Sequence, residues 1–307
     1  MTDPGAAAEP WRAEVDALAA RARQALEAVL PPPEVPPARI HEAMRYSALA
    51  GGKLLRPVLV MAAARCVGGP AALTPAVERA AAAVELVHTY SLIHDDLPAM
   101  DDDAMRRGQP ANHVVFGEAM AILAGDALLT LAFEVLADLP RWGVDPAVAV
   151  QVAAELARAA GTQGLIGGQV DDLAATRGAP VDLATLRSIH RRKTGALFCA
   201  CVRIGARLGG ADAAALEALT AYATAFGEAF QIVDDILDVT GDEAELGKPV
   251  GSDARRGKVT VPGLVGLEAA RRMAAEATER AVASLQPLGQ RAAVLAWLAR
   301  SLLQRRR

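Results

Sequence analysis

The chain has 307 residues, of which 52% are apolar and 22% are charged, and its formal net charge is -4. This length is long for one domain, but a single large helical domain can hold it, and the apolar share provides for a substantial core. The mild negative charge argues against a nucleic-acid-binding protein, because such proteins carry a strong basic bias. We therefore expect no nucleic-acid partner.

Three further observations concern location. Cys66, Cys199 and Cys201 form no C-x-x-C pair and are expected to be small buried side chains in a reducing compartment. The first 14 residues lack the basic-then-apolar pattern of a signal peptide. No uninterrupted apolar run looks long enough to span a bilayer. These patterns predict a cytoplasmic protein without a membrane span.

The composition favours helix over sheet, because alanine and leucine dominate and β-branched residues form few alternating runs. Residues 1–10 are expected to be a flexible N-terminal tail, and residues 11–307 a single all-α domain without strands. Apolar periodicity near 3.6, with Gly and Pro in the gaps, predicts helices near 11–30, 38–50, 54–67, 74–97, 116–139, 146–163, 183–208, 213–240, 262–285 and 290–305.

Two of these helices carry additional expectations. The helix near 116–139 is apolar on nearly every side, which predicts a position at the centre of a bundle. The last helix is followed by three arginines, residues 305–307, which are expected to complement its C-terminus. A specific anionic partner for these arginines is the alternative.

Two aspartate-rich clusters, far apart in the sequence, interrupt apolar stretches. Closely packed carboxylates repel one another and are costly to desolvate, so a fold that keeps them needs a compensating cation. Oxygen ligands without nearby Cys or His favour Mg²⁺. One such cluster can arise by chance, but two with apolar flanks predict a site where metal ions hold a diphosphate. The carboxylates are Asp95, Asp96 and Asp101, and Asp234, Asp235 and Asp238.

The spacing within each cluster predicts its geometry. In the second cluster, helical spacing of three and four places the carboxylates on one face, which Gln231 shares. In the first, Asp95 and Asp101 are six apart, and Pro98 is expected to end the helix and let the chain turn Asp101 back. His88 lies two turns before Asp95 and is expected to point toward the site, with a packed core histidine as the alternative.

Basic residues lie beside glycines or beside the acidic clusters. Taken singly each is an ordinary surface charge, but as a group they form the arrangement that a diphosphate needs. Gly51 and Gly52 would let a bare backbone approach a phosphate. No P-loop string is present. The set comprises Lys53, Arg56, Arg106, Arg107, Lys193 with Thr194, Lys248 and Lys258.

With these residues in place, the chain resembles the trans-isoprenyl diphosphate synthases, and among them most closely the bacterial farnesyl diphosphate synthases. The matching strings occur in family order over roughly residues 40–270. They are residues 51–57 (GGKLLRP), 91–101 (SLIHDDLPAMD), 106–108 (RRG), 116–119 (FGEA), 123–128 (LAGDAL), 167–169 (GGQ), 193–197 (KTGAL) and 230–238 (FQIVDDILD).

The resemblance implies an isoprenoid-synthase-type helical bundle around a deep central cavity, usually a homodimer. It also implies head-to-tail condensation of isopentenyl diphosphate with dimethylallyl or geranyl diphosphate, giving (2E,6E)-farnesyl diphosphate, with three Mg²⁺ ions. Geranylgeranyl diphosphate synthase is the nearest alternative. A class I terpene cyclase and a non-catalytic partner subunit are more distant, because both acidic motifs and a second basic set are present.

The family motif also assigns roles. The six clustered aspartates would hold Mg²⁺ on the allylic diphosphate, and Thr194 and Gln231 would turn oxygen dipoles toward the developing cation. Tyr90 and Ser91 occupy the chain-length positions, and the bulky Tyr90 implies a C15 product. The allylic diphosphate would contact Arg106, Lys193 and Lys258, with Lys248 nearby. Isopentenyl diphosphate would contact Gly52, Lys53, Arg56, His88 and Arg107.

Three positions depart from the family pattern. Leu54 stands where an Arg is common, so isopentenyl diphosphate loses one peripheral contact. Ala104 shortens the acidic run after Asp101, and Val261 replaces a frequent Tyr. None of these changes removes a motif residue, so activity is expected.

Overall fold

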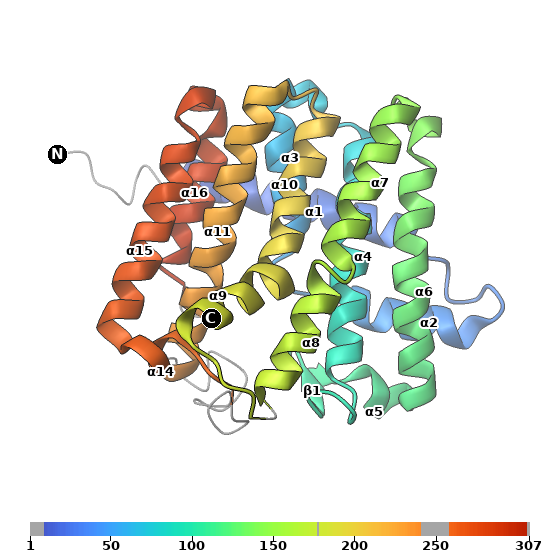
Figure 1. The fold of residues 1–307 in the computed structure, drawn as a ribbon. Helices are drawn as coiled ribbons and strands as arrows, with labels where there is room; N and C mark the ends of the chain where they lie inside the picture. The colour runs from blue at the N-terminus through green and yellow to red at the C-terminus, as the bar shows by residue number, and fades with distance from the viewer. Residues whose placement is uncertain (1–8, 177, 241–257, 306–307) are drawn as a thin grey trace.

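The computed structural model describes residues 9–176, 178–240 and 258–305, and these residues are almost entirely helical (Figure 1). The all-α expectation is confirmed. The N-terminal half contains α1 (Glu9–Val29), α2 (Ala38–Ala48), α3 (Leu55–Gly68), α4 (Pro75–Asp95), α5 (Asn112–Phe116), α6 (Glu118–Ala137) and α7 (Pro146–Ala160). The C-terminal half contains α8 (Leu165–Thr176), α9 (Leu183–His190), α10 (Ala196–Leu208), α11 (Ala213–Thr240), α14 (Val261–Val265), α15 (Leu267–Ser284) and α16 (Ala293–Leu302).

Shorter elements join these helices. A π-helical turn, η3 (Arg191–Gly195), runs from α9 into α10, and three 3₁₀ turns cover Pro70–Ala72, Leu139–Trp142 and Gln286–Ala292. A two-stranded antiparallel ribbon, β1 (Met105–Arg106) and β2 (Gln109–Pro110), was not expected from the sequence. It follows the first acidic cluster directly.

The helix at the centre of the bundle is α4. It begins at the N-cap Thr74, whose side chain accepts a hydrogen bond from the Val77 N–H, and Pro75 fills the first helical position. Most of its residues are buried, including a run of alanines from Ala80 to Ala83 that lets neighbouring helices approach closely. It packs against α1, α3, α6 and α10, so its C-terminal end is held from several sides.

The prediction that the helix near 116–139 lies at the centre is wrong, because α6 lies at the edge of the bundle (Figure 1). Its inner face packs on α4, but Ile122 and Leu123 are 44% and 51% exposed. Among the described residues, α6 also has the length and hydropathy of a membrane span. Asp126 near its middle would make such a span costly, by about 3 kcal/mol.

A second difference is α8, which was not expected. Its sequence contains Gly167 and Gly168, which lower helix propensity. The helix forms because Gly168 packs directly on η3: a Cβ there would lie 2.2 Å from the Lys193 backbone nitrogen. Tertiary packing therefore outweighs propensity in this segment.

The ends of the chain and the cysteines complete the comparison. The predicted tail, residues 1–10, falls mostly outside the described part of the chain, and α1 begins at Glu9. Cys66 and Cys201 are buried and Cys199 is partly buried, all three as free thiols. Burial raises the pKa of the Cys66 thiol to about 11, so this cysteine is an unreactive core residue.

Candidate active site

The first acidic cluster forms a tight turn at the end of α4. The helix ends at Asp95, and the Asp101 N–H donates to the Asp95 carbonyl at 2.9 Å. The Asp103 N–H donates to the Asp96 carbonyl at 3.1 Å. The chain therefore turns back around Pro98 and returns Asp101 to the end of the helix, as the sequence predicted.

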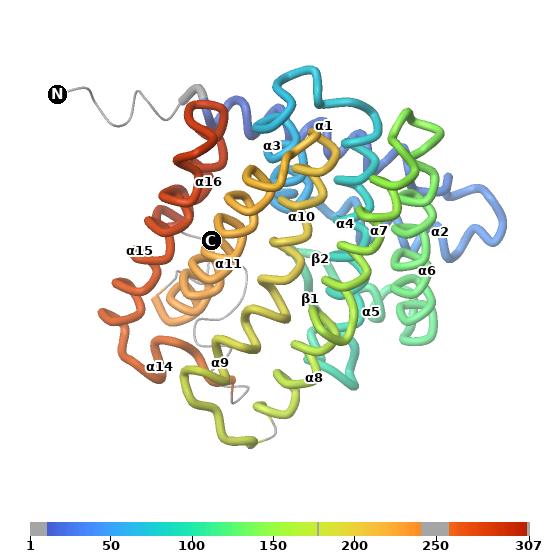
Figure 2. Tube along the Cα trace, turned by 45° about the horizontal axis from the view of Figure 1, so that its top comes forward, coloured from blue at the N-terminus to red at the C-terminus, as the bar shows by residue number. Residues whose placement is uncertain are grey.

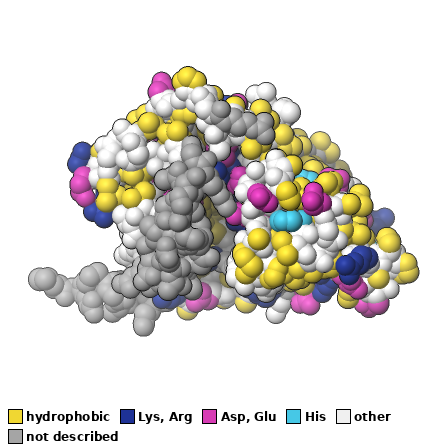
Figure 3. All heavy atoms as spheres, turned by 90° about the horizontal axis from the view of Figure 1, so that it is seen from below, with side chains coloured by type: hydrophobic (Ala, Val, Ile, Leu, Met, Phe, Trp, Pro, Cys, Tyr) yellow, Lys and Arg dark blue, Asp and Glu magenta, His cyan; other side chains and the backbone are white. Residues whose placement is uncertain are grey.

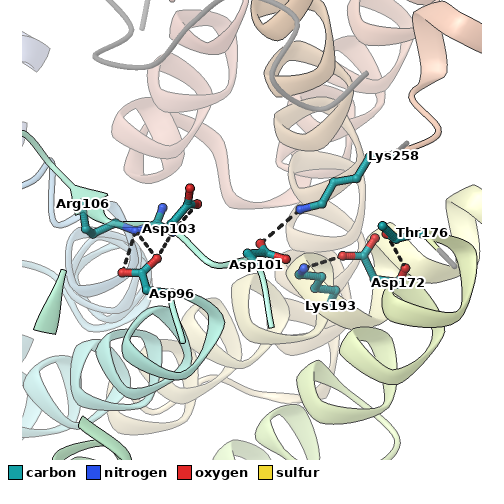
Figure 4. A network of polar contacts seen from close by, with 8 residues as sticks. All are labelled: Asp96, Asp101, Asp103, Arg106, Asp172, Thr176, Lys193 and Lys258. Carbon is teal, nitrogen blue, oxygen red and sulfur yellow. Dashed lines mark hydrogen bonds and ion pairs between the residues drawn. The ribbon is translucent and has the colours of Figure 1, made fainter. Parts of the chain in front are cut away.

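Asp96 has a structural partner within this turn. The Arg106 guanidinium clasps both carboxylate oxygens of Asp96, with Nε 3.0 Å and 3.2 Å from them, and lies 3.6 Å from Asp103 (Figure 4). The Asp96 side chain is only 3% exposed. Burial raises the pKa of Asp96, and its hydrogen bonds to Arg106 oppose that rise. This bidentate pair ties the ribbon that follows the cluster to α4.

Two lysines reach the first cluster from distant parts of the chain. Lys258 donates to Asp101 at 3.2 Å, and Lys193 on η3 donates to Asp172 on α8 at 2.6 Å (Figure 4). Sequence reasoning missed Asp172, because it lies on the helix that was not expected. Its only signal was the Gly167–Gly168–Gln169 string three residues earlier.

Asp95 lies within electrostatic reach of these cations. Burial raises the pKa of its carboxyl group to about 6. Lys193, Arg106 and Lys258 favour the ionised form, whereas Asp101 opposes it. A carboxylate in this position is short of positive charge, and a further cation would stabilise it.

The second acidic cluster lies on the last turns of α11, and its carboxylates do not all face the same way. Asp234 is 50% exposed, and one of its oxygens lies 3.9 Å from Arg305. Asp235 is buried and accepts from the Val261 N–H at 2.9 Å and from Gln231 Nε2 at 3.1 Å. Gln231 and Asp235 therefore share a face, as expected, and the other oxygen of Asp235 fastens α14 to α11. Asp238 is 2% exposed.

The π-helical turn η3 brings Thr194, next to Lys193, to Gln231 beside the second cluster. The Thr194 hydroxyl donates to Gln231 Oε1 at 2.9 Å. The extra residue of a π turn re-aims the side chains that follow it, and such turns are frequent at functional sites. Two glycines make this fit possible, since a Cβ on Gly168 or on Gly227 would meet the η3 backbone at 2.2 Å or 3.1 Å.

A basic cavity of about 770 Å³ lies beside the acidic clusters, and it brings together every residue that the sequence suggested for isopentenyl diphosphate. Gly51 and Gly52 have φ values of +90° and +114°, a backbone region that favours glycine. A Cβ on Gly52 would lie 2.9 Å from Arg107 Cζ. The suggested residues that line the cavity are Gly52, Lys53, Arg56, His88 and Arg107.

Burial shifts the pKa values of titratable side chains in this cavity. Burial lowers the pKa of Arg56, whereas Glu85 raises it, and the guanidinium stacks 4.7 Å from the centre of the Phe198 ring. Burial lowers the pKa of His88 well below its usual value, and Arg56 and Arg107 lower it further. His88 is therefore a neutral hydrogen-bonding group near pH 7 and contributes no positive charge.

Two further residues of the cavity wall were missed or interpreted differently. Glu85 is 2% exposed and was not singled out, because a lone Glu in a helical run carries no signal. Arg305 does not simply complement the end of α16: it stacks 4.6 Å from the centre of the Phe230 ring and approaches Asp234. Arg305 thus lies against α11, which Figure 2 shows as a tube.

The chain-length positions lie on α4, one turn before Asp95. Tyr90 is 5% exposed and makes an edge contact with His94, with ring centres 5.7 Å apart. Burial raises the pKa of Tyr90 to about 12, with Asp95 contributing. Ser91 donates its hydroxyl to the His88 carbonyl at 2.8 Å, which turns it back along its own helix.

The remaining predicted positions are placed as follows. Leu54 is 5% exposed and adopts a left-handed conformation, with φ +47°, at the start of α3. Ala104 is exposed, and its carbonyl accepts from the Ala111 N–H. Val261 contributes its backbone N–H to Asp235, a bond that does not depend on its side chain. Lys248 lies outside the described residues.

The acidic side chains fit a hard divalent cation. Figure 3 shows acidic side chains, in magenta, near the middle of one face of the molecule. The donors of the two clusters are all oxygens, and the raised pKa of the partly buried Asp95 shows that a further cation would stabilise its ionised form. Within the described part of the chain, no three Asp, Glu, His or Cys side chains are grouped closely enough to enclose an ion. Mg²⁺ does not require such a cage, because it usually binds one or two carboxylates, waters and substrate phosphates.

Known proteins resemble this chain over most of its length. Residues 37–292 match the family model described as polyprenyl synthetase. Farnesyl diphosphate synthase of Escherichia coli is 49% identical over 278 residues, 90% of this chain and 92% of that protein. Chloroplastic geranylgeranyl pyrophosphate synthase of Capsicum annuum is 50% identical over 254 residues, 83% of this chain and 68% of that protein.

A similar fold is found in a crystal structure. The apo structure of an FPP/GFPP synthase from Zymomonas mobilis superimposes with a TM-score of 0.85 at 39% identity. The match covers 96% of this chain and 99% of that one.

Proposed function

Because this chain belongs to the polyprenyl synthetase family, we propose that it is a farnesyl diphosphate synthase, a trans-prenyltransferase that joins isopentenyl diphosphate head-to-tail to dimethylallyl or geranyl diphosphate. The contact between Lys258 and Asp101 carries the proposal. It brings the segment that follows the second acidic cluster to the first one, beside a basic cavity. Two charged regions suited to two diphosphates thereby become neighbours.

Different basic residues serve the two diphosphate substrates. Arg106, Lys193 and Lys258 stabilise the negative charge that grows on the departing allylic diphosphate. Each already touches a carboxylate of the site or its wall. On the other side, Lys53, Arg56 and Arg107 hold isopentenyl diphosphate with its alkene toward the reacting carbon.

Two polar groups lie where the cation would form. Thr194 and Gln231 are joined by a 2.9 Å hydrogen bond, and their oxygens are the dipoles that we assign to the developing allylic cation. Apolar surroundings, including Phe230 and Phe198, exclude water that would quench it. The departing diphosphate is the acceptor that we assign to the proton lost at the end.

Mg²⁺ is the proposed metal, and three ions bound with the allylic diphosphate would supply positive charge to the leaving group as a Lewis acid. Asp95, Asp101 and Asp234 are the best placed of the six clustered aspartates to hold it. Asp96 and Asp235 carry more of the structural contacts and would act mainly by fixing their neighbours.

We further propose a cytoplasmic homodimer. The exposed apolar side of α6, with Ile122 and Leu123, is a surface that a second copy would cover, and Val150 on α7, 69% exposed, extends the apolar area. The C15 product rests on Tyr90, whose buried ring lies one turn behind Asp95. Relatives named for farnesyl and for geranylgeranyl products are about equally similar, so geranylgeranyl diphosphate synthase is the second candidate.

The test is a product analysis. Purified protein is incubated with Mg²⁺, labelled isopentenyl diphosphate and, in turn, dimethylallyl, geranyl and farnesyl diphosphate, with a parallel reaction in chelator. We expect a C15 diphosphate from the first two starters, little extension of the third and no product in chelator. A main C20 product would support the second candidate, a cyclic hydrocarbon would indicate a terpene cyclase, and no product would refute the proposal.

A further inference from the structure

The basic cavity contains a buried carboxylate that no role so far explains. Glu85 lies on α4, one turn before His88, and is 2% exposed. It lines the same cavity as Lys53, Arg56 and Arg107. An acid at a site suited to an anion should weaken binding unless it does something else, because like charges repel.

The arginines around Glu85 supply the reason for its position. A guanidinium does not lose its proton in proteins, so a buried arginine needs a compensating charge. Glu85 raises the pKa of Arg56 more than any other acidic group does, and its Oε1 lies 3.8 Å from Arg107 Nη2. Burial raises the pKa of Glu85, and Arg56 and Arg107 both oppose that rise. The three groups therefore interact electrostatically.

The contact is long enough to leave the arginines available. Arg107 is held from a second side, where its Nη1 donates to the Gly51 carbonyl at 2.6 Å. The buried Nε of Arg56 has no hydrogen-bond partner among the described residues. The guanidinium groups are thus fixed in direction, while donors remain for another acceptor.

An ion pair elsewhere in the molecule shows the contrast. Glu155 on α7 also serves two arginines, Arg203 and Arg207 of α10, but at 2.7–3.1 Å and with several hydrogen bonds. Those bonds use the donors that face the carboxylate and tie two helices together. Glu155 does not line the basic cavity. Glu85, in contrast, lines the cavity, and its contact with Arg107 is longer, at 3.8 Å.

We propose that Glu85 is a positioning residue for isopentenyl diphosphate, holding Arg107 and Arg56 so that their open N–H donors meet the incoming diphosphate. The inference rests on the proposed function of this cavity. An arginine side chain has several rotatable bonds, and fixing it before binding lowers the entropic cost of association. Without the carboxylate, buried guanidinium groups would swing toward solvent, where their charge is hydrated.

The test compares Glu85→Gln with Glu85→Asp and with the control Glu155→Gln, which also removes a carboxylate shared by two arginines. Initial rates give kcat and separate KM values for isopentenyl and allylic diphosphates. In Glu85→Gln we expect the KM for isopentenyl diphosphate to rise about tenfold or more. The KM for the allylic substrate and kcat should change less than about threefold, a split that general structural damage would not produce.

The other two variants complete the comparison. Glu85→Asp keeps the negative charge, but its shorter side chain moves the carboxylate away from the two arginines. Its KM for isopentenyl diphosphate should therefore lie between those of the wild type and Glu85→Gln. Glu155→Gln should lower the melting temperature and leave both KM values unchanged. If Glu85→Gln does not fold, Glu85→Asp decides: a KM for isopentenyl diphosphate equal to that of the wild type would overturn the proposal.

Three results with folded protein would also overturn it: an unchanged KM for isopentenyl diphosphate in Glu85→Gln, a lower one, or equal rises for both substrates. Calorimetric titration with isopentenyl diphosphate alone separates this proposal from the proposed function. If the wild type forms no product but binds isopentenyl diphosphate more tightly than Glu85→Gln, the function fails and the role of Glu85 stands. If the wild type does not bind it, both fail.

Discussion

At the scale of single residues, the raised pKa of Asp95 can be tested through the pH dependence of folding stability. Its folded pKa, about 6, lies above the usual aspartate value of 3.8. The folded protein therefore holds this proton more tightly than the unfolded chain does. The stabilisation that comes from this tighter proton binding is fully present below about pH 4 and is lost as the pH rises through about 6.

Asp95→Asn removes this dependence, because asparagine resembles the protonated acid. In metal-free buffer, we expect the variant to gain stability relative to the wild type between about pH 4 and pH 6, by about 3 kcal/mol, with no further change above that range. Denaturant unfolding of both proteins across this pH range measures the difference. A difference that stays constant or changes sign would contradict the assignment.

Tyr90 offers a second prediction at this scale. Tyr90→Ala removes a buried ring one turn behind Asp95, so we expect longer products, toward C20, and a loss of roughly 3 kcal/mol of stability. Tyr90→Phe is the matched control: the buried hydroxyl has no hydrogen-bond partner among the described residues, so product length should not change. Chromatography of the dephosphorylated alcohols measures length. An unchanged distribution in Tyr90→Ala would place the end of the product tunnel elsewhere.

Single residues also show what sequence could reveal. Pro98 and the six-residue spacing of Asp95 and Asp101 predicted the turn, because proline geometry is local. The hydrogen bond that ties Asp235 to α14 could not be predicted, since its partner is the backbone of Val261, 26 residues away. Glu85 was missed for the same reason, because its role depends on arginines in other segments of the chain.

At the scale of elements, the contact between α8 and η3 positions Lys193 and Thr194. In Gly168→Ala, the new Cβ would meet backbone atoms of Lys193 at 2.2 Å and 2.6 Å, so the two elements must separate. A displacement of about 1 Å at reacting groups can lower turnover about 100-fold. We expect a loss of that order in kcat/KM for the allylic substrate, with the protein still folded.

Gly195→Ala is the control for this prediction. A Cβ on Gly195 would meet only the His190 carbonyl oxygen, at 3.6 Å, and its φ of -65° suits any residue. We therefore expect near-normal rates and a gain of roughly 0.5–1 kcal/mol in stability. Equal rates in Gly168→Ala and the wild type would show that the packing of α8 does not position Lys193.

Elements also mark a limit of sequence reasoning. Most long helices were predicted from periodicity and punctuation, and their positions are confirmed. The helix α8 and the π turn were not, because glycines that signal a break in isolation here permit two backbones to touch. Local pattern and tertiary packing give opposite signals at Gly168, and packing prevails.

At the scale of the whole molecule, the exposed apolar side of α6 is the surface on which the proposed homodimer can be tested. Leu123→Glu would place a charge in the proposed interface between two copies. We expect it to weaken dimer association by roughly 2 kcal/mol, about 30-fold. Sedimentation over a range of protein concentrations measures this.

Leu264→Glu is the matched control, since Leu264 is 39% exposed on α14, on the opposite side of the molecule (Figure 1). It should leave association unchanged. A wild type that stays monomeric at high concentration, or equal association of the two variants, would refute this interface. The same helix explains the error in the sequence analysis: an all-round apolar pattern does not distinguish a helix inside its own bundle from one at the edge with an apolar outer face.

The wall of the basic cavity takes Lys53 from near the start of the chain and Arg305 from near its end. During synthesis, these two side chains can meet only after the final helix has left the ribosome. A nascent chain stopped after α11 would lack both Lys258 and Arg305, so no shortened half of this protein should work by itself. This cavity wall is therefore complete only once the chain has reached Arg305.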